Sequence, residues 1–329
     1  MKTLCLFIAI VSFVQVVFSQ TEDKKDDRIA AVRSLSIGSS SNRLAVATEK
    51  NIFIFDLHSL RQIQVIKTIE KPRKIAFTKK GSLIVLNRAK AGQLNFLKGE
   101  TQLDSIFAGQ SLEDMHYDAL ASTLYLIQFT GKVLIYKENK RSIFEFIRSI
   151  TPPTRITRIA TSRNHVAMGL QNGEILIFDK ANMRELLSLR GHTAAINLLS
   201  FSENGETIVS SASKEREKKS SGEEVILWGL KDQKIKFRTE DRYTEVVDIR
   251  IADNREVIVS SAGEIVRHDF AGKPSIQISI YPYKFALFAL TREKLIYGIA
   301  DANHPSEYLY VLDLRTMQIE KNLRINAED

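Results

Sequence analysis

One short β-type segment recurs seven times along the 329-residue chain, at intervals of about forty residues. It often ends in an aromatic residue followed by aspartate. Its copies are Asn51–Asp56, Gln93–Leu97, Lys132–Tyr136, Glu174–Asp179, Glu224–Gly229, Glu264–Asp269 and Tyr308–Asp313. A period of this length is typical of one supersecondary unit that is repeated and that buries its apolar faces against its neighbours. The chain is therefore predicted to contain seven copies of one unit.

Each unit contains a β-hairpin. Most copies follow a second β-type run, such as Arg43–Thr48 or His165–Leu170, and a tight turn such as Gln171–Gly173 joins the two runs. A strand before the hairpin and a strand after it complete four strands per unit, and no segment shows the sustained apolar spacing of a helix. The sequence predicts an all-β fold, a seven-bladed β-propeller of four-stranded antiparallel blades over residues 29–325.

The ends of this region bear on how the ring closes. Ile29–Ile37 can form the inner strand of the first blade, and Met317–Ile325 can form the outer strand of the last. No spare strand then remains for exchange between the two blades. We expect closure to rest on packing of the first blade against the seventh, unless Thr21–Arg28 adds a short edge strand.

Residues 190–230 carry the motifs of a known family. The pair Gly191-His192 is followed by Ser200–Glu206, with the sequence SFSENGE, and the unit ends in Leu227-Trp228-Gly229. This unit resembles a WD-repeat, which has a Gly-His pair, a strand with a turn and a Trp-Asp end at these places. The other six units keep only fragments of the pattern.

The resemblance implies a buried, hydrogen-bonded set of side chains that braces the blade. His192, Ser210 or Ser211, and Trp228 supply three of its members. The fourth member in this family is an aspartate in the tight turn. Here a basic insert, which begins with Lys214–Lys219, replaces that turn. We interpret the insert as either a tolerated surface loop or a contact, regulatory or proteolytic site.

Propellers bind partners mostly through the loops that enter the innermost strands. Alignment of these strands places fourteen residues at the mouth of the channel: Arg33-Ser34, Arg73-Lys74, Glu113-Asp114, Thr157-Arg158, Asn197-Leu198, Val247-Asp248 and Ala286-Leu287. The candidate partner-binding residues at and around this rim are Arg33, Arg73, Lys74, Arg155, Arg158, Arg242, Tyr243, Tyr283 and Lys284. A basic and aromatic rim suits an acidic segment of a partner protein. Alternatively, Glu113 and Asp114 neutralise the cations within the rim.

Signals for catalysis are weak. The six histidines have no metal-ligand spacing, and the single cysteine is Cys5. There is no nucleophile elbow, phosphate-binding loop or dinucleotide fingerprint. We therefore expect a non-catalytic platform without cofactor or metal. The alternative from another class is a propeller hydrolase or lactonase whose carboxylate or metal site uses Glu113, Asp114 and Asp248.

The charge balance and the N-terminus indicate where the protein works. With 47 Lys and Arg against 39 Asp and Glu, the surface is mixed, so nucleic acid is not an indicated partner. Lys2, the apolar run Leu4–Phe18 and the small Ser19 are typical of a cleaved secretory signal peptide over residues 1–20. Residues 21–28 are then a polar segment and residues 326–329 a short tail. We expect a protein that is secreted or lies in the secretory-pathway lumen, without stable membrane insertion. An uncleaved leader that anchors the propeller is the alternative.

Overall fold

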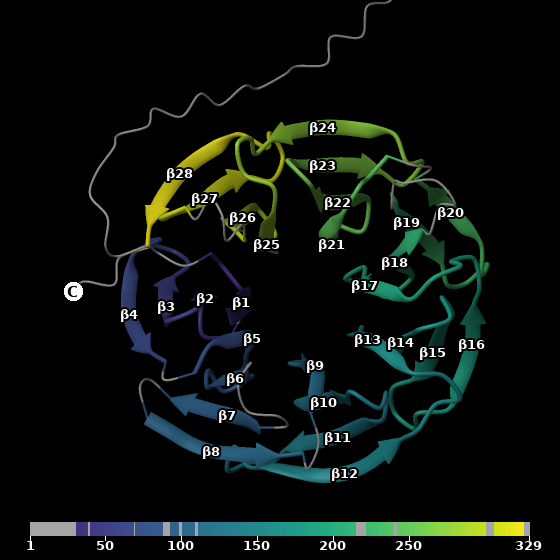
Figure 1. Ribbon diagram of the computed structural model, residues 1–329, viewed down its shortest axis with the longest axis horizontal. Helices are drawn as coiled ribbons and strands as arrows, with labels where there is room; N and C mark the ends of the chain where they lie inside the picture. Colours follow the sequence, from purple (N-terminus) through teal and green to yellow (C-terminus); the bar gives the residue numbers. More distant parts are fainter. Residues whose placement is uncertain are drawn as a thin grey trace, which may run out of the picture.

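Seven four-stranded antiparallel sheets surround a central channel in the computed structural model (Figure 1). The structure describes residues 31–38, 40–68, 70–87, 93–98, 101–108, 111–214, 222–239, 242–300 and 306–325. Within these ranges there is no helix, and consequently none long and apolar enough to cross a membrane. The predicted all-β, seven-bladed propeller is confirmed.

Every blade is a meander of four consecutive strands. The innermost strands are β1 (Ser34–Gly38), β5 (Pro72–Phe77), β9 (Leu112–Asp118), β13 (Ile156–Thr161), β17 (Ile196–Phe201), β21 (Val246–Ala252) and β25 (Ala286–Leu290). The second strands are β2 (Arg43–Ala47), β6 (Leu83–Asn87), β10 (Thr123–Gln128), β14 (His165–Leu170), β18 (Thr207–Lys214), β22 (Glu256–Ser261) and β26 (Lys294–Ile299).

The seven recurring segments of the sequence form the third strands. These are β3 (Asn51–Asp56), β7 (Gln93–Lys98), β11 (Val133–Glu138), β15 (Ile175–Asp179), β19 (Gly222–Gly229), β23 (Glu264–Asp269) and β27 (Tyr308–Asp313). The outermost strands are β4 (Gln62–Lys67), β8 (Thr101–Phe107), β12 (Phe144–Ile150), β16 (Glu185–Leu189), β20 (Ile235–Arg238), β24 (Pro274–Ser279) and β28 (Ile319–Arg324).

Burial explains why the middle strands are almost continuously apolar. A blade is covered on both faces by its neighbours, so both faces of its middle strands must be hydrophobic. In β3, for example, the four residues from Ile52 to Phe55 are all buried. Seven apolar clusters fill the seven spaces between adjacent blades. The core is therefore a ring of interfaces between blades.

The aspartate that often ends the recurring segment caps the turn after it. Asp313 Oδ1 accepts hydrogen bonds from the backbone N–H groups of Arg315 and Thr316, at 2.9 and 2.7 Å. Asp56 and Asp179 accept bonds from their own turns in the same way. Short polar side chains favour such turns because they satisfy backbone donors locally. The repeated aspartate is therefore a turn-forming residue.

The first and seventh blades meet without exchanging a strand. Each of them has four consecutive strands of its own. The backbone N–H of Val32 donates to the carbonyl of Ile299, at 2.8 Å, and one apolar cluster joins the two blades. Residues 1–20, 21–28, 215–219 and 326–329 lie outside the described residues.

Candidate binding site at the channel mouth

The innermost strands of all seven blades line one cavity of about 550 Å³ in the channel. Ten of the fourteen residues that the strand alignment placed at the mouth lie on its wall: Arg33, Ser34, Arg73, Lys74, Asp114, Arg158, Leu198, Val247, Asp248 and Leu287. The other four, Glu113, Thr157, Asn197 and Ala286, do not line the cavity.

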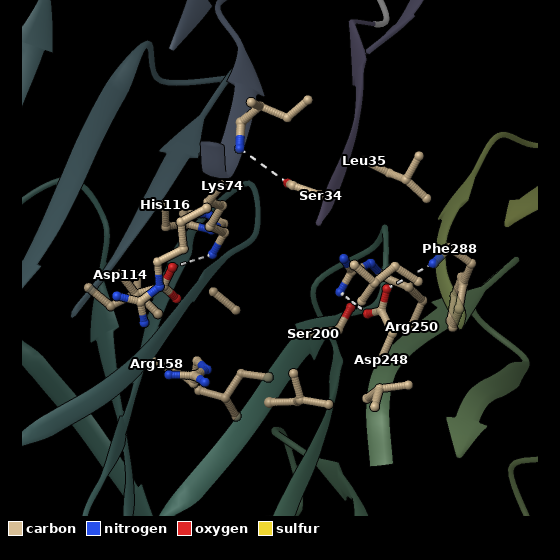
Figure 2. A pocket seen from close by; sticks show the side chains of 18 of the residues that line it. Ser34, Leu35, Lys74, Asp114, His116, Arg158, Ser200, Asp248, Arg250 and Phe288 are labelled. Carbon is tan, nitrogen blue, oxygen red and sulfur yellow. Dashed lines mark hydrogen bonds and ion pairs between the residues drawn. The ribbon is translucent and has the colours of Figure 1, made fainter. Parts of the chain in front are cut away.

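Two ion pairs face the cavity from different sides (Figure 2). Lys74 Nζ lies 2.7 Å from Asp114 Oδ1, and Arg250 Nη1 lies 3.1 Å from Asp248 Oδ1. Burial raises the pKa of Asp114, but the nearby charges of Lys74 and Arg158 outweigh this effect and lower it. Burial raises the pKa of Asp248 in spite of the Arg250 charge. Two of the wall cations are thus neutralised by wall carboxylates.

Two further cations of the rim pair with carboxylates that do not line the cavity. Arg33 Nη2 lies 2.5 Å from Glu49 Oε1. Arg155 holds Glu113 Oε2 with both Nη2, at 2.7 Å, and Nε, at 3.1 Å. The Arg155 guanidinium also lies 4.5 Å from the ring centroid of Phe129, which suits a cation–π contact. Glu113 and Asp114 thus pair with Arg155 and Lys74, as in the alternative of a self-paired rim, and Glu49 pairs with Arg33.

Arg73 and Arg158 are the exceptions. Arg73 is exposed, and its Nη1 makes a long contact of 3.4 Å to the carbonyl of Leu112. Arg158 is half-buried, and its Nη1 donates to the carbonyl of Thr157 at 2.6 Å. Within the described residues no carboxylate lies at ion-pair distance from either guanidinium. Neither guanidinium is thus held in an ion pair, although the charge of Arg158 also acts on Asp114.

His116 and Arg250 also line the cavity, although sequence reasoning did not select them. They lie two residues after Asp114 and Asp248, so the period-two alternation of a strand could have indicated both. His116 Nε2 lies 2.8 Å from Thr161 Oγ1. Burial, reinforced by the nearby Lys74 charge, lowers the His116 pKa to about 4, so this ring is neutral at pH 7.

Some residues at the predicted mouth connect neighbouring blades. Innermost strands of adjacent blades belong to different sheets, so their backbone groups need other partners. Ser34 Oγ accepts a bond from the N–H of Ile75, at 3.1 Å. Thr157 Oγ1 donates to the carbonyl of Ile196, at 2.6 Å. Ser34 and Thr157 thus have a structural role, because their hydroxyl groups join neighbouring blades.

The remaining rim candidates differ in accessibility. Arg242 and Lys284 are exposed, and Tyr283 is half-buried against the cluster between blades six and seven. Tyr243 was expected on the rim, but it is only 1% exposed. Its ring fills the cluster between blades five and six, and its hydroxyl bonds to His268 Nε2. Tyr243 therefore presents no surface to a partner, which corrects the prediction.

The brace residues lie together in blade five. Trp228 Nε1 donates to Ser210 Oγ at 2.8 Å, and Ser210 Oγ lies 2.7 Å from His192 Nε2. His192 Nδ1 lies 2.8 Å from Glu224 Oε2, so Glu224 is the fourth member of the set. Ser211 is not part of it, since its buried hydroxyl has no hydrogen-bond partner among the described residues. Although Ser210, His192 and Glu224 form a Ser-His-acid chain, Ser210 is fully buried and no substrate can reach it.

The carboxylates of the hydrolase alternative are held apart. Asp114 and Asp248 face the cavity from different sides, and Glu113 does not line it (Figure 2). Each of the three pairs with a cation of its own. In the part of the chain that the structure describes, no three His, Cys, Asp or Glu side chains gather as metal ligands.

Comparison with known proteins finds a distant match in amino-acid sequence. No protein-family model matches the chain. A stretch of 145 residues, 41% of the chain, is 26% identical to pre-mRNA-processing factor 19 of Schizosaccharomyces pombe. The match spans 27% of that protein's length. With the seven four-stranded blades and the buried set of His192, Ser210 and Trp228, this likeness supports the resemblance of the chain to WD-repeat β-propellers.

Proposed function

We propose that this protein is a non-catalytic platform that binds an acidic segment of a partner protein at the channel mouth. WD-repeat propellers generally bind proteins. The observation that carries the proposal is the state of Arg73 and Arg158. Both line the cavity, and neither has a carboxylate partner within the described residues.

The charge of the wall supports an anionic ligand. Five cations line the cavity against two carboxylates, and His116 adds no charge at neutral pH. Because Arg33 pairs with Glu49, the excess of positive charge comes from Arg73 and Arg158. A guanidinium can hold a carboxylate through two parallel hydrogen bonds, which gives both strength and orientation. Arg73 belongs to blade two and Arg158 to blade four, with the Lys74–Asp114 pair joining blades two and three. A segment with two carboxylates could contact both guanidinium groups.

Affinity capture with a charge-reversed variant tests this proposal. The protein, tagged at its C-terminus, is used to capture partners from a secretory fraction, beside the double variant Arg73→Glu, Arg158→Glu. The matched control is Lys231→Glu, Arg255→Glu, which changes the charge equally at exposed turns on the opposite face. We expect the wild type and the control to retain an acidic partner that the folded double variant loses. Equal retention by all three proteins would overturn the proposal.

We further propose that the platform works outside the cytosol, in the secretory pathway or beyond it. The support is the basic Lys2, the apolar run Leu4–Phe18 and the small Ser19. Mass spectrometry of protein collected from the culture medium should find a mature N-terminus after Ser19 or Gln20. A chain that keeps its leader and resists carbonate extraction would instead be membrane-anchored.

A further inference from the structure

Exposed apolar side chains gather in blade three. The described residues include ten exposed large hydrophobic side chains, and five of them lie in this one blade: Leu120, Phe129, Ile143, Phe146 and Ile147. Single exposed apolar residues are ordinary, whereas contiguous ones mark a contact surface, and of these five Leu120 and Ile147 line the same groove.

A groove of about 890 Å³ lies between blades three and four. Leu120 and Ile147, 71% and 56% exposed, line it together with the buried or half-buried Tyr125, Ile135 and Met183. Ile147 lies in a β-bulge. Ile135 pairs with Arg148 and Tyr136 pairs with Phe146, so Ile147 has no pairing partner in β11. A bulge re-aims a side chain, and here it leaves a branched apolar group on the groove wall.

The groove also carries unpaired positive charge. Lys137, Arg148 and Arg163 are exposed and line it, and within the described residues none has a carboxylate partner. The lining carboxylate of Asp179 accepts two backbone N–H bonds from its own turn. Lys180, which also lines the groove, is half-buried and paired with the buried Asp118. The charge left for a ligand is positive.

The groove lies on the face opposite the channel mouth. Its loops join the first to the second strand in blades three and four, and the third to the fourth strand in blade four. In a meander these turns lie at one end of the sheet, and the loops that enter the innermost strands lie at the other. The groove is thus independent of the site proposed above.

We infer that this groove is a second binding surface, which takes a short acidic peptide segment bearing bulky apolar side chains from a partner protein. The three cations favour carboxylates on the ligand. Burial of the exposed Leu120 and Ile147 side chains contributes binding free energy when the same ligand also brings apolar groups against them. Neither a purely charged nor a purely apolar ligand uses both features.

Fluorescence polarisation with short labelled peptides tests the inference. Each peptide of a first pool contains two Leu or Phe residues among Asp and Glu residues, and the pool covers every order of these residues. Two further pools replace the apolar residues by Ser or the acids by Lys. We expect members of the first pool to bind at least about tenfold more tightly than their counterparts in the other two. Ser-containing peptides that bind equally well would reduce the contact to charge attraction and overturn the inference. So would failure of the whole first pool to bind.

Variants locate the contact. Ile147→Ser with Arg163→Glu should weaken binding about tenfold or more. Ile63→Ser with Arg61→Glu makes the same changes at exposed positions of blade one and should leave binding unchanged. The channel variant Arg73→Glu, Arg158→Glu should also bind normally. An unchanged affinity in the folded Ile147→Ser, Arg163→Glu variant would overturn the inference while leaving the channel-mouth proposal untouched.

Discussion

Lys74 and Asp114 form an ion pair between the innermost strands of blades two and three, with 2.7 Å between Nζ and Oδ1. The lysine side chain is 40% exposed and that of the aspartate 14%. The carboxylate therefore has much less water around it than its partner. Its charge depends on Lys74 and on the nearby Arg158, which lower the Asp114 pKa against the opposing effect of burial.

The Lys74→Met variant should be less stable than the wild type at neutral pH, by about 1–3 kcal/mol, because a mostly buried carboxylate loses its partner. A carboxyl whose pKa is lowered by folding adds stability above its unfolded pKa, and this stability is lost as the pH falls through the folded pKa. Urea unfolding at pH 7 and near pH 3 should therefore show a smaller difference between the two proteins at the lower pH. An equal difference at both values would mean that the pair is not its source.

The brace of blade five provides a comparison of two adjacent serines. Ser210→Ala leaves the buried Trp228 Nε1 and His192 Nε2 without their common partner. We expect a loss of about 2–4 kcal/mol, the cost of two buried polar groups left unpaired. Ser211→Ala removes a buried hydroxyl that has no partner among the described residues, so the stability should change little. Urea unfolding of both variants checks this, and equal losses would contradict the assignment of the brace.

The fold could be predicted because its signal is local and repeated. The middle strands of every blade are buried on both faces, so the sequence of each is an apolar run. The turn after the third strand often carries an aspartate that caps it. The alternation of side chains along a strand then places the residues of the channel wall. His116 and Arg250 were within reach of the same reasoning, two residues beyond Asp114 and Asp248.

The sequence offered neutralisation of rim cations by Glu113 and Asp114 as one alternative, but it could not say which cation pairs with which carboxylate. Lys74 and Asp114 are 40 residues apart, and whether they meet depends on how neighbouring blades pack. Tyr243 shows the same limit. An aromatic residue beside an arginine predicts a rim contact, but the packing of blades five and six encloses the ring of Tyr243. The groove beside blade three combines three turns with a β-bulge at Ile147, and the aspartate that marks one of these turns does not indicate that they meet in a groove.

Glu223 should make the protein less stable as the pH rises toward neutrality. Burial, aided by the charge of Glu245, raises the Glu223 pKa to about 7. Between its ordinary value near 4.5 and about 7 the folded state binds the proton more tightly than the unfolded state, so stability falls as the pH rises through this window. Glu223→Gln should be more stable than the wild type at pH 8, on the order of 1 kcal/mol after allowance for solvent screening. At pH 4 the two should be alike, and a Gln variant that is equal to the wild type at both values would refute the shift.

His116 should act in the opposite direction. Burial, with the Lys74 charge as the next cause, lowers its pKa from 6.5 to about 4, so the unfolded state binds the proton more tightly than the folded state. Stability should therefore rise with pH between about 4 and 6.5 and then level off. His116→Gln can keep a bond to Thr161 without taking up a proton, and its stability should be flatter over this range. NMR titration of the His116 ring gives a direct measurement: a pKa near 6.5 would show that water reaches the ring from the channel, and the pH dependence would then have to come from other groups.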